Sequence, residues 1–158
     1  MSHSKWLNQT VQMAVNNVAK GGGPFAAIVV KDEKVIGTET NKVHISHDPS
    51  AHAELEAIRE ACSNLSSTDL SSAILYASGE PCPMCLGAAY WAKVGTIYYA
   101  CSKAEALAGT GFSNPLSSFF TDQNKLPEDR SVPFIQLETA HSIVPFQKWN
   151  SLNSGVDS

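Results

Sequence analysis

The sequence predicts an α/β fold, an α-β-α sandwich in which a single mixed five-stranded sheet carries helices on both faces. Its 158 residues are the length of one domain, and a composition of 43% hydrophobic and 16% charged residues is typical of a chain with a buried core. Short apolar runs bounded by turn residues alternate with segments of helical periodicity. The alternation of strand and helix indicates one sheet covered by helices.

The first quarter of the chain predicts a helix followed by a β-hairpin. Apolar residues recur at helical spacing until three glycines and Pro24 end the pattern. The apolar run 25–30 and the extended segment 35–36 flank a polar turn, which predicts two antiparallel strands. The apolar residues with helical spacing are Leu7, Val11, Ala14, Val15 and Val18.

The rest of the chain alternates helix and strand. Ser102 and Glu105 form a capping-box pattern for a short helix, and Pro83 suits the first turn of another. The segment 109–130 reads as an irregular functional loop or an inserted turn of helix. The expected elements are a helix over 48–62, a strand over 73–77, a helix over 81–93, a strand over 96–101, a helix over 102–109, a fifth strand over 132–138 and a last helical segment over 145–152.

Charge and hydropathy exclude several classes of function. The formal net charge is −4 and no block of like charge stands out, so non-specific binding to a nucleic-acid backbone is not expected. No apolar stretch approaches the roughly 20 residues of a membrane-spanning helix, and residues 1–10 lack the apolar core of a signal peptide. We therefore expect a cytoplasmic protein, whose four cysteines stay reduced and are available for metal binding or chemistry.

Two short motifs carry the residue types of a zinc site. His52-Ala53-Glu54 opens one predicted helix and Pro81-Cys82-Pro83-Met84-Cys85 opens the next. At a helix start, free backbone amides and the helix dipole favour the thiolates of Cys82 and Cys85. Residues two apart diverge by about 200° inside a helix, so His52 and Glu54 share a site only if their helix begins near His52. Three such ligands predict a tetrahedral zinc ion with one open position.

A closed, purely structural zinc site is the alternative, and it needs a fourth protein ligand. Cys62 lies ten residues along the helix from His52, about 15 Å away, which is too far. Spacing does not exclude Cys101, His44 or His47 as that ligand. Residue spacing alone therefore does not decide between an open and a closed zinc site.

These motifs resemble the cytidine-deaminase superfamily, and within it the bacterial guanine deaminases of cytidine-deaminase-like fold. The resemblance implies one Zn²⁺ per chain, held by His52, Cys82 and Cys85, with Glu54 as the catalytic acid and base. It implies hydrolysis of guanine to xanthine with release of ammonia. The matching stretches are Gly23 to Phe25, Asp48 to Glu54, Ala57 to Arg59, Glu80 to Ala88, Tyr90-Trp91, Pro145 to Gln147, and Trp149.

The resemblance also points to substrate contacts. Asn41 is expected to bond the base, and the alternative is a turn Asn that satisfies its own backbone. Ala53 is expected to offer backbone groups. Phe25 and Trp91 either line the ring pocket or serve as core aromatics.

One departure from the guanine-deaminase pattern concerns Ser113. Relatives carry an acidic residue after a Gly-Phe pair, where this chain reads Gly111-Phe112-Ser113-Asn114. A neutral side chain accepts less strongly from the amino-purine edge. Isocytosine, cytosine or an amino-triazine therefore stay open as substrates beside guanine.

The C-terminal segment is expected to act as a lid on one deaminase domain spanning residues 1–158. In that interpretation Phe146 and Trp149, within the tail 140–158, close the site of the same chain or of a partner. The alternative is that they only anchor the tail. The resemblance implies a homodimer, with tails exchanged between subunits in some relatives.

Two other functions remain open. A tRNA adenosine deaminase shares both motifs. Such an enzyme must hold an RNA stem-loop and usually carries a basic face for it, and the net charge of −4 argues against such a face. A non-catalytic member would use zinc only for folding. An acidic Glu54 next to such a metal argues against that role.

Overall fold

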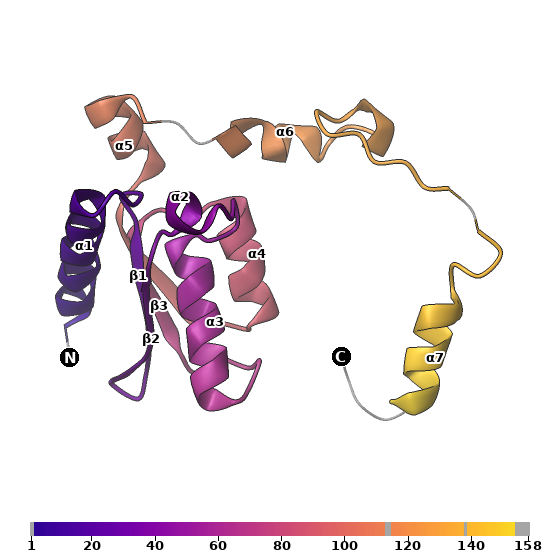
Figure 1. Cartoon of the computed structure of the whole chain (residues 1–158), viewed down its shortest axis with the longest axis horizontal. Helices are drawn as coiled ribbons and strands as arrows, with labels where there is room; N and C mark the ends of the chain where they lie inside the picture. Colours follow the sequence, from indigo (N-terminus) through magenta and orange to yellow (C-terminus); the bar gives the residue numbers. More distant parts are fainter. Residues whose placement is uncertain (1, 113–114, 138, 154–158) are drawn as a thin grey trace. The chain divides into compact units, whose positions relative to one another are not determined.

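The structure is a computed structural model that describes residues 2–112, 115–137 and 139–153. The chain divides into two compact units, residues 1–117 and 118–158. The first unit contains the sheet and most of the helices (Figure 1). Its elements are α1 (His3–Ala19), β1 (Ala26–Lys31), β2 (Lys34–Thr40), α2 (Val43–Ser46), α3 (Ala53–Leu65), β3 (Ile74–Gly79), α4 (Pro83–Trp91), β4 (Thr96–Cys101) and α5 (Lys103–Thr110).

The first unit is built on a mixed sheet in the order β2-β1-β3-β4. Strand β1 is antiparallel to both β2 and β3, whereas β3 and β4 are parallel and are connected through α4. Helix α1 covers one face, and α3 and α4 lie side by side on the other (Figure 1). The predicted α/β class and the mixed sheet between helices are confirmed.

The prediction of five strands is wrong, because the sheet formed by the described residues has four. The expected fifth strand falls in the second unit, where residues 132–137 adopt no strand conformation and residue 138 lies outside the described part. Val132, Ile135 and Leu137 are exposed there. Within residues 118–137 and 139–153 there is no other strand with which this apolar run could form a ladder, so its composition alone does not make a strand.

The second unit holds only short helical elements. Helix α7 (Val144–Leu152) confirms the predicted last segment. The 3-10 helix η1 (Pro115–Ser118) crosses the boundary between the units, and the interpretation of 109–130 as a loop with inserted helical turns agrees with η1, α6 (Phe119–Asp122) and η2 (Pro127–Asp129).

The core of the first unit lies on both faces of the sheet. Against α3 and α4 it is built mainly from small and aliphatic side chains such as Val29, Ala57 and Leu75. Gly37 of β2 lets α3 approach closely, since a Cβ there would lie 2.3 Å from the backbone oxygen of Ala57. This close contact fixes α3, the helix whose N-cap residue is His52.

Helix α1 packs on the other face of the sheet. It buries Trp6 against Ile28 and Tyr76, whereas Val11, Val15 and Val18, which recur at helical spacing, are exposed. The predicted helix is confirmed, but these three valines do not lie on the face that it buries. The buried residues of α1 are Trp6, Thr10, Ala14 and Asn17.

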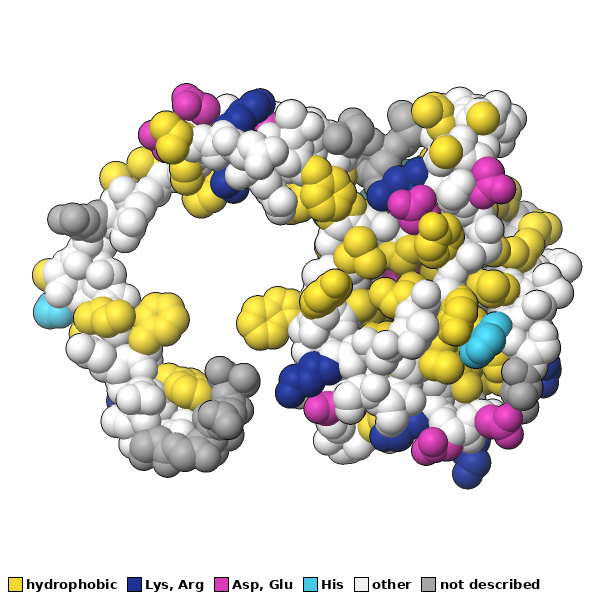
Figure 2. Space-filling model, turned by 180° about the vertical axis from the view of Figure 1, so that it is seen from behind, with side chains coloured by type: hydrophobic (Ala, Val, Ile, Leu, Met, Phe, Trp, Pro, Cys, Tyr) yellow, Lys and Arg dark blue, Asp and Glu magenta, His cyan; other side chains and the backbone are white. Residues whose placement is uncertain are grey.

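The surface of the first unit carries many apolar side chains. Figure 2 shows them gathered over the side turned away from the view of Figure 1. Tyr90, Trp91 and Tyr99 are among the exposed large residues. Among the described residues, none of the helices has the length and apolar composition that crossing a membrane requires.

Candidate active site

Helix α3 begins at Ala53, five residues after the predicted start at Asp48, but still next to His52 as a shared site requires. His52 is the extended N-cap residue, with φ −72° and ψ 149°, and the helix runs from Ala53. The carboxylate of Asp48 accepts hydrogen bonds from Ser50 N at 2.8 Å and Ser50 Oγ at 2.7 Å, which order the preceding loop and hold the pKa of Asp48 below its usual value. Because His52 lies just before the first turn and Glu54 lies within it, both can point to one site.

Helix α4 places its two cysteines in the same way. Cys82 is the extended N-cap, Pro83 occupies the first helical position, and Cys85 follows in the third. Both side chains are buried, Cys82 at 5% exposure and Cys85 at 0%. The start of a second helix therefore brings two sulfur atoms to the site of His52.

The three donor atoms form a nearly equilateral triangle. Nδ1 of His52 lies 3.6 Å from Sγ of Cys82 and 3.6 Å from Sγ of Cys85, and the two sulfurs are 3.6 Å apart. Zinc–sulfur bonds of about 2.3 Å and zinc–nitrogen bonds of about 2.0–2.1 Å at tetrahedral angles would separate the sulfurs by about 3.8 Å and sulfur from nitrogen by about 3.6 Å. These residues can hold a metal ion and fit one face of a tetrahedral site.

The electrostatics of the cluster favour a bound cation. A hydrogen bond from the Cys85 thiol lowers the pKa of Cys82 to about 4, and the same bond raises the pKa of Cys85. The pKa of His52 is raised chiefly by its hydrogen bond with Cys82. The site thus concentrates negative charge on sulfur, which a cation between the three donors would neutralise.

Glu54 stands beside this triangle without being part of it. Its side chain is only 5% exposed, and burial raises the pKa of its carboxyl group. Its interactions with His52 and with the Cys85 thiol lower that pKa by less than burial raises it. A buried carboxylate next to a group of metal donors is typical of a site that moves protons.

The possible fourth ligands lie elsewhere. His44, His47 and Cys101 are exposed, and Cys62 packs partly buried against the core, as expected from its distance. Within the part of the chain that the structure describes, the donor cluster contains His52, Cys82 and Cys85 alone. The cluster as described therefore offers three protein ligands to a metal ion.

Asn41 and Phe25 are joined by a backbone hydrogen bond, and a second backbone hydrogen bond joins the residue after Asn41 to the residue before His52. Asn41 is 6% exposed, and its N–H donates to Phe25 O at 3.0 Å. Lys42 N donates to Ala51 O at 2.9 Å, directly before His52. Ala53, the first residue of α3, is fully buried in the core.

Phe25 also has an aromatic partner, Phe112, to which the sequence analysis assigned no role. Its ring meets that of Phe112 edge to face, with centroids 5.6 Å apart. Phe112 follows Gly111, the left-handed C-cap residue of α5, and this Gly-Phe pair is the local sequence signal for the contact.

The remaining predicted contacts are Trp91, Ser113, Phe146 and Trp149. Trp91 is 88% exposed at the last residue of α4, six residues beyond Cys85, so the interpretation as a core aromatic is wrong. It lies at the opposite end of the helix from the cysteines. Phe146 and Trp149 are exposed on α7 in the second unit, and Ser113 lies outside the described residues.

The sequence model of the MafB19-like deaminases matches residues 1–124. The chain belongs to this deaminase family. The resemblance drawn from the motifs is thereby confirmed, and three relatives extend the comparison.

This MafB19-like deaminase is 43% identical to guanine deaminase of Bacillus subtilis (strain 168) over 152 residues, 96% of each chain. The X-ray structure of guanine deaminase from Bacillus subtilis has a TM-score of 0.90 at 41% identity, covering 99% of both chains. A guanine deaminase from Nitrosomonas europaea has a TM-score of 0.64 at 30% identity, covering 71% of this chain and 65% of its own. The tRNA-specific adenosine deaminase of Buchnera aphidicola is 35% identical over 99 residues, 63% of this chain and 66% of its own.

Proposed function

We propose that this deaminase hydrolyses guanine, taking up water and releasing xanthine and ammonia. The observation that carries the proposal is the triangle of His52, Cys82 and Cys85 with the buried Glu54 beside it. Similarity to a guanine deaminase over 96% of both chains supports guanine as the base.

The metal of this proposal is one Zn²⁺ per chain. Two sulfurs and one imidazole nitrogen are the donors that zinc prefers, and their 3.6 Å separations fit its tetrahedral bonds. When bound, zinc supplies Lewis acidity that lets water lose a proton near neutral pH. His52, Cys82 and Cys85 would hold it, leaving the fourth position to water and substrate.

Glu54 would move the protons of the reaction. Its carboxylate accepts a proton from the attacking water and passes it to the ring nitrogen next to the amino-bearing carbon. It then takes the second proton of that water from the new hydroxyl group, which becomes the carbonyl, and delivers it to the departing amine. A bond from water oxygen to carbon forms, the bond from carbon to nitrogen breaks, and ammonia leaves. The burial of Glu54 keeps bulk water from competing for these protons.

Asn41, Phe25 and the backbone of Ala53 are the proposed contacts to the base. The oxygen Oδ1 of Asn41 accepts from Val43 N at 3.2 Å, which leaves its Nδ2 as the group offered to the ring. Phe25, braced by Phe112, suits one side of a planar heterocycle.

The remaining contacts and the assembly belong to the same proposal. Ser113 would meet the amino-purine edge, and Phe146 and Trp149 would cover the bound base as part of the tail 140–158. Trp91 stays a predicted contact as well. A homodimer in the cytoplasm, with or without exchanged tails, is the expected form of this single deaminase domain.

A tRNA adenosine deaminase is the second candidate, supported by the 35% identity to such an enzyme. That similarity covers 63% of this chain, whereas the similarity to guanine deaminase covers 96%. The net charge of −4 also argues against binding an RNA stem-loop. We therefore favour the free base.

Ammonia release separates these functions. The zinc-loaded protein should release ammonia from guanine and not from an anticodon stem-loop carrying adenosine. Preferential release from isocytosine, cytosine or an amino-triazine would keep the mechanism and change the base, whereas release from the stem-loop alone would establish the tRNA function.

A further inference from the structure

Asn17 is a buried polar residue on α1. Its side chain is 6% exposed, whereas Asn16 and Val18 on either side are exposed. Burying an amide is costly unless its hydrogen-bonding groups find partners. The partners of Asn17 therefore indicate what this residue does.

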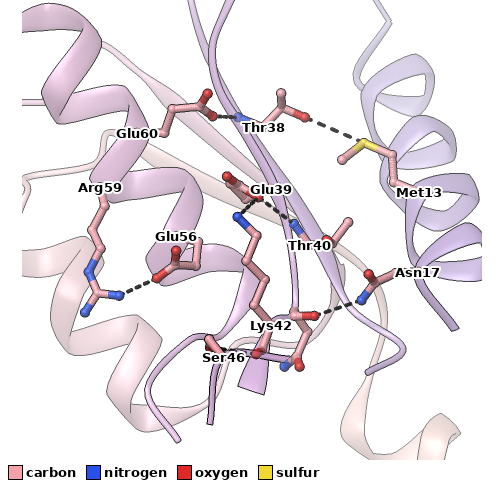
Figure 3. Close-up of polar contacts among 11 residues, drawn as sticks. Met13, Asn17, Thr38, Glu39, Thr40, Lys42, Ser46, Glu56, Arg59 and Glu60 are labelled. Carbon is pink, nitrogen blue, oxygen red and sulfur yellow. Dashed lines mark hydrogen bonds and ion pairs between the residues drawn. The ribbon is translucent and has the colours of Figure 1, made fainter. Parts of the chain in front are cut away.

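Both hydrogens of the Asn17 amide are used. Nδ2 donates to Gly23 O at 2.9 Å and to Asn41 O at 2.9 Å. Figure 3 shows the amide reaching from α1 to the chain just beyond β2. One side chain thus ties the end of α1 to two separate loops.

The first of these loops is wrapped tightly around the amide. Gly22 N donates to the backbone oxygen of Asn17 at 2.9 Å, and a Cβ at Gly22 would lie 2.3 Å from Nδ2 of Asn17. Gly23, whose oxygen accepts from Asn17, is two residues before Phe25. The amide therefore fixes the approach to Phe25.

The second loop carries Asn41. The backbone N–H of Asn41 donates to Phe25 O at 3.0 Å, and its side-chain Oδ1 accepts from Val43 N at 3.2 Å. Across residues 2–112, 115–137 and 139–153, Nδ2 of Asn41 makes no hydrogen bond. No fully buried side-chain nitrogen of the described residues lacks a partner, so this nitrogen keeps some exposure.

We propose that Asn17 is a positioning residue for the nucleobase. By holding the carbonyls of Gly23 and Asn41, it sets Phe25 and directs the free Nδ2 of Asn41 toward an acceptor atom of the ring. This role rests on the proposed function. Asn17 acts through Asn41 and is separate from the proton transfers of Glu54, so it controls binding of the base and leaves the chemical step unchanged.

The substitution Asn17→Asp tests the role with almost no change in shape. It replaces the two N–H donors by an oxygen that faces two carbonyl oxygens. Asn16→Asp is the matched control, because it makes the same change of charge one residue earlier, and its Oδ1 keeps the hydrogen bond from Gln12 Nε2. For zinc-loaded protein and guanine, we expect Asn17→Asp to raise KM about tenfold with kcat within about threefold, and Asn16→Asp to change neither.

Amide hydrogen exchange without substrate gives a second readout. In Asn17→Asp the amides of residues 41–43 should exchange at least about tenfold faster, while those of α3 keep the wild-type rates. Should Asn17→Asp fail to fold, Asn17→Ser takes its place in both measurements, since its hydroxyl keeps one donor and a smaller rise in KM is expected.

A wild-type KM in folded Asn17→Asp overturns the proposal, whether or not its amide exchange rates change. A loss of activity confined to kcat overturns it as well. Wild-type protein that is loaded with zinc yet inert on guanine overturns the proposed function instead. In that case the exchange rates of residues 41–43 still decide whether Asn17 positions Asn41.

Discussion

Replacing Glu54 by Gln separates its chemical role from its structural one. The amide keeps the size of the carboxylate and an accepting oxygen, but it cannot take up a proton. General acid-base groups contribute about 10²- to 10⁴-fold to the rate, so kcat for guanine should fall by that factor, about 2.7–5.4 kcal/mol at 1.36 kcal/mol per factor of ten.

The same Glu54→Gln change should not reduce stability, although it reduces activity. The Glu54 side chain is 5% exposed, and an ionised group held there for chemistry costs folding free energy. Removing its charge should leave the free energy of unfolding unchanged or raise it by up to about 2 kcal/mol. For a chain of this size that corresponds to a melting temperature between the wild-type value and about 8 °C above it, at roughly 2–4 °C per kcal/mol.

The assay measures ammonia release at saturating guanine, zinc content and the melting temperature on one preparation. Glu56→Gln is the control, since Glu56 lies two residues further along α3 and pairs with Arg59 at the surface. It should keep wild-type kcat and lose at most about 1 kcal/mol of stability. Glu54→Gln with more than about a tenth of wild-type kcat would refute the assignment of Glu54 as the proton carrier.

Three further changes test other parts of the site. Cys85→Ala should lose stoichiometric zinc, and elemental analysis that finds one zinc per chain in this variant would overturn the ligand set. Ser113→Asp should raise kcat/KM for guanine relative to isocytosine if the loop meets the amino-purine edge; an unchanged ratio would dissociate the loop from specificity. Gly37→Ala should destabilise the chain by about 1–3 kcal/mol in urea unfolding, because its Cβ would meet Ala57 O at 2.3 Å, and wild-type stability would contradict this packing.

The centre of the site follows from local rules that act within a few residues. The N-cap positions of His52 and Cys82, and Cys85 in the third position of its helix, are set by sequence signals at helix starts. Spacing therefore predicts that each motif presents its donors at the start of a helix, whereas the meeting of the two helix starts depends on the packing of α3 beside α4. The parallel strands β3 and β4 follow equally from the alternation of strand and helix.

Features that depend on distant partners could not be predicted in this way. The apolar run 132–137 resembles a strand, but strand formation needs a neighbouring strand, and composition does not report one. Trp91 reads as a buried aromatic and is exposed. The buried face of α1 includes Asn17, because two carbonyls from other loops meet its amide there, and no periodicity of apolar residues reveals such partners.

The most direct test is product analysis with guanine and stoichiometrically zinc-loaded wild-type protein. The proposed function predicts one ammonia and one xanthine for each guanine consumed, with no turnover by a preparation of Cys85→Ala that lacks zinc. Guanine left intact by the zinc-loaded wild-type protein, or turned over equally fast without the metal, would contradict it.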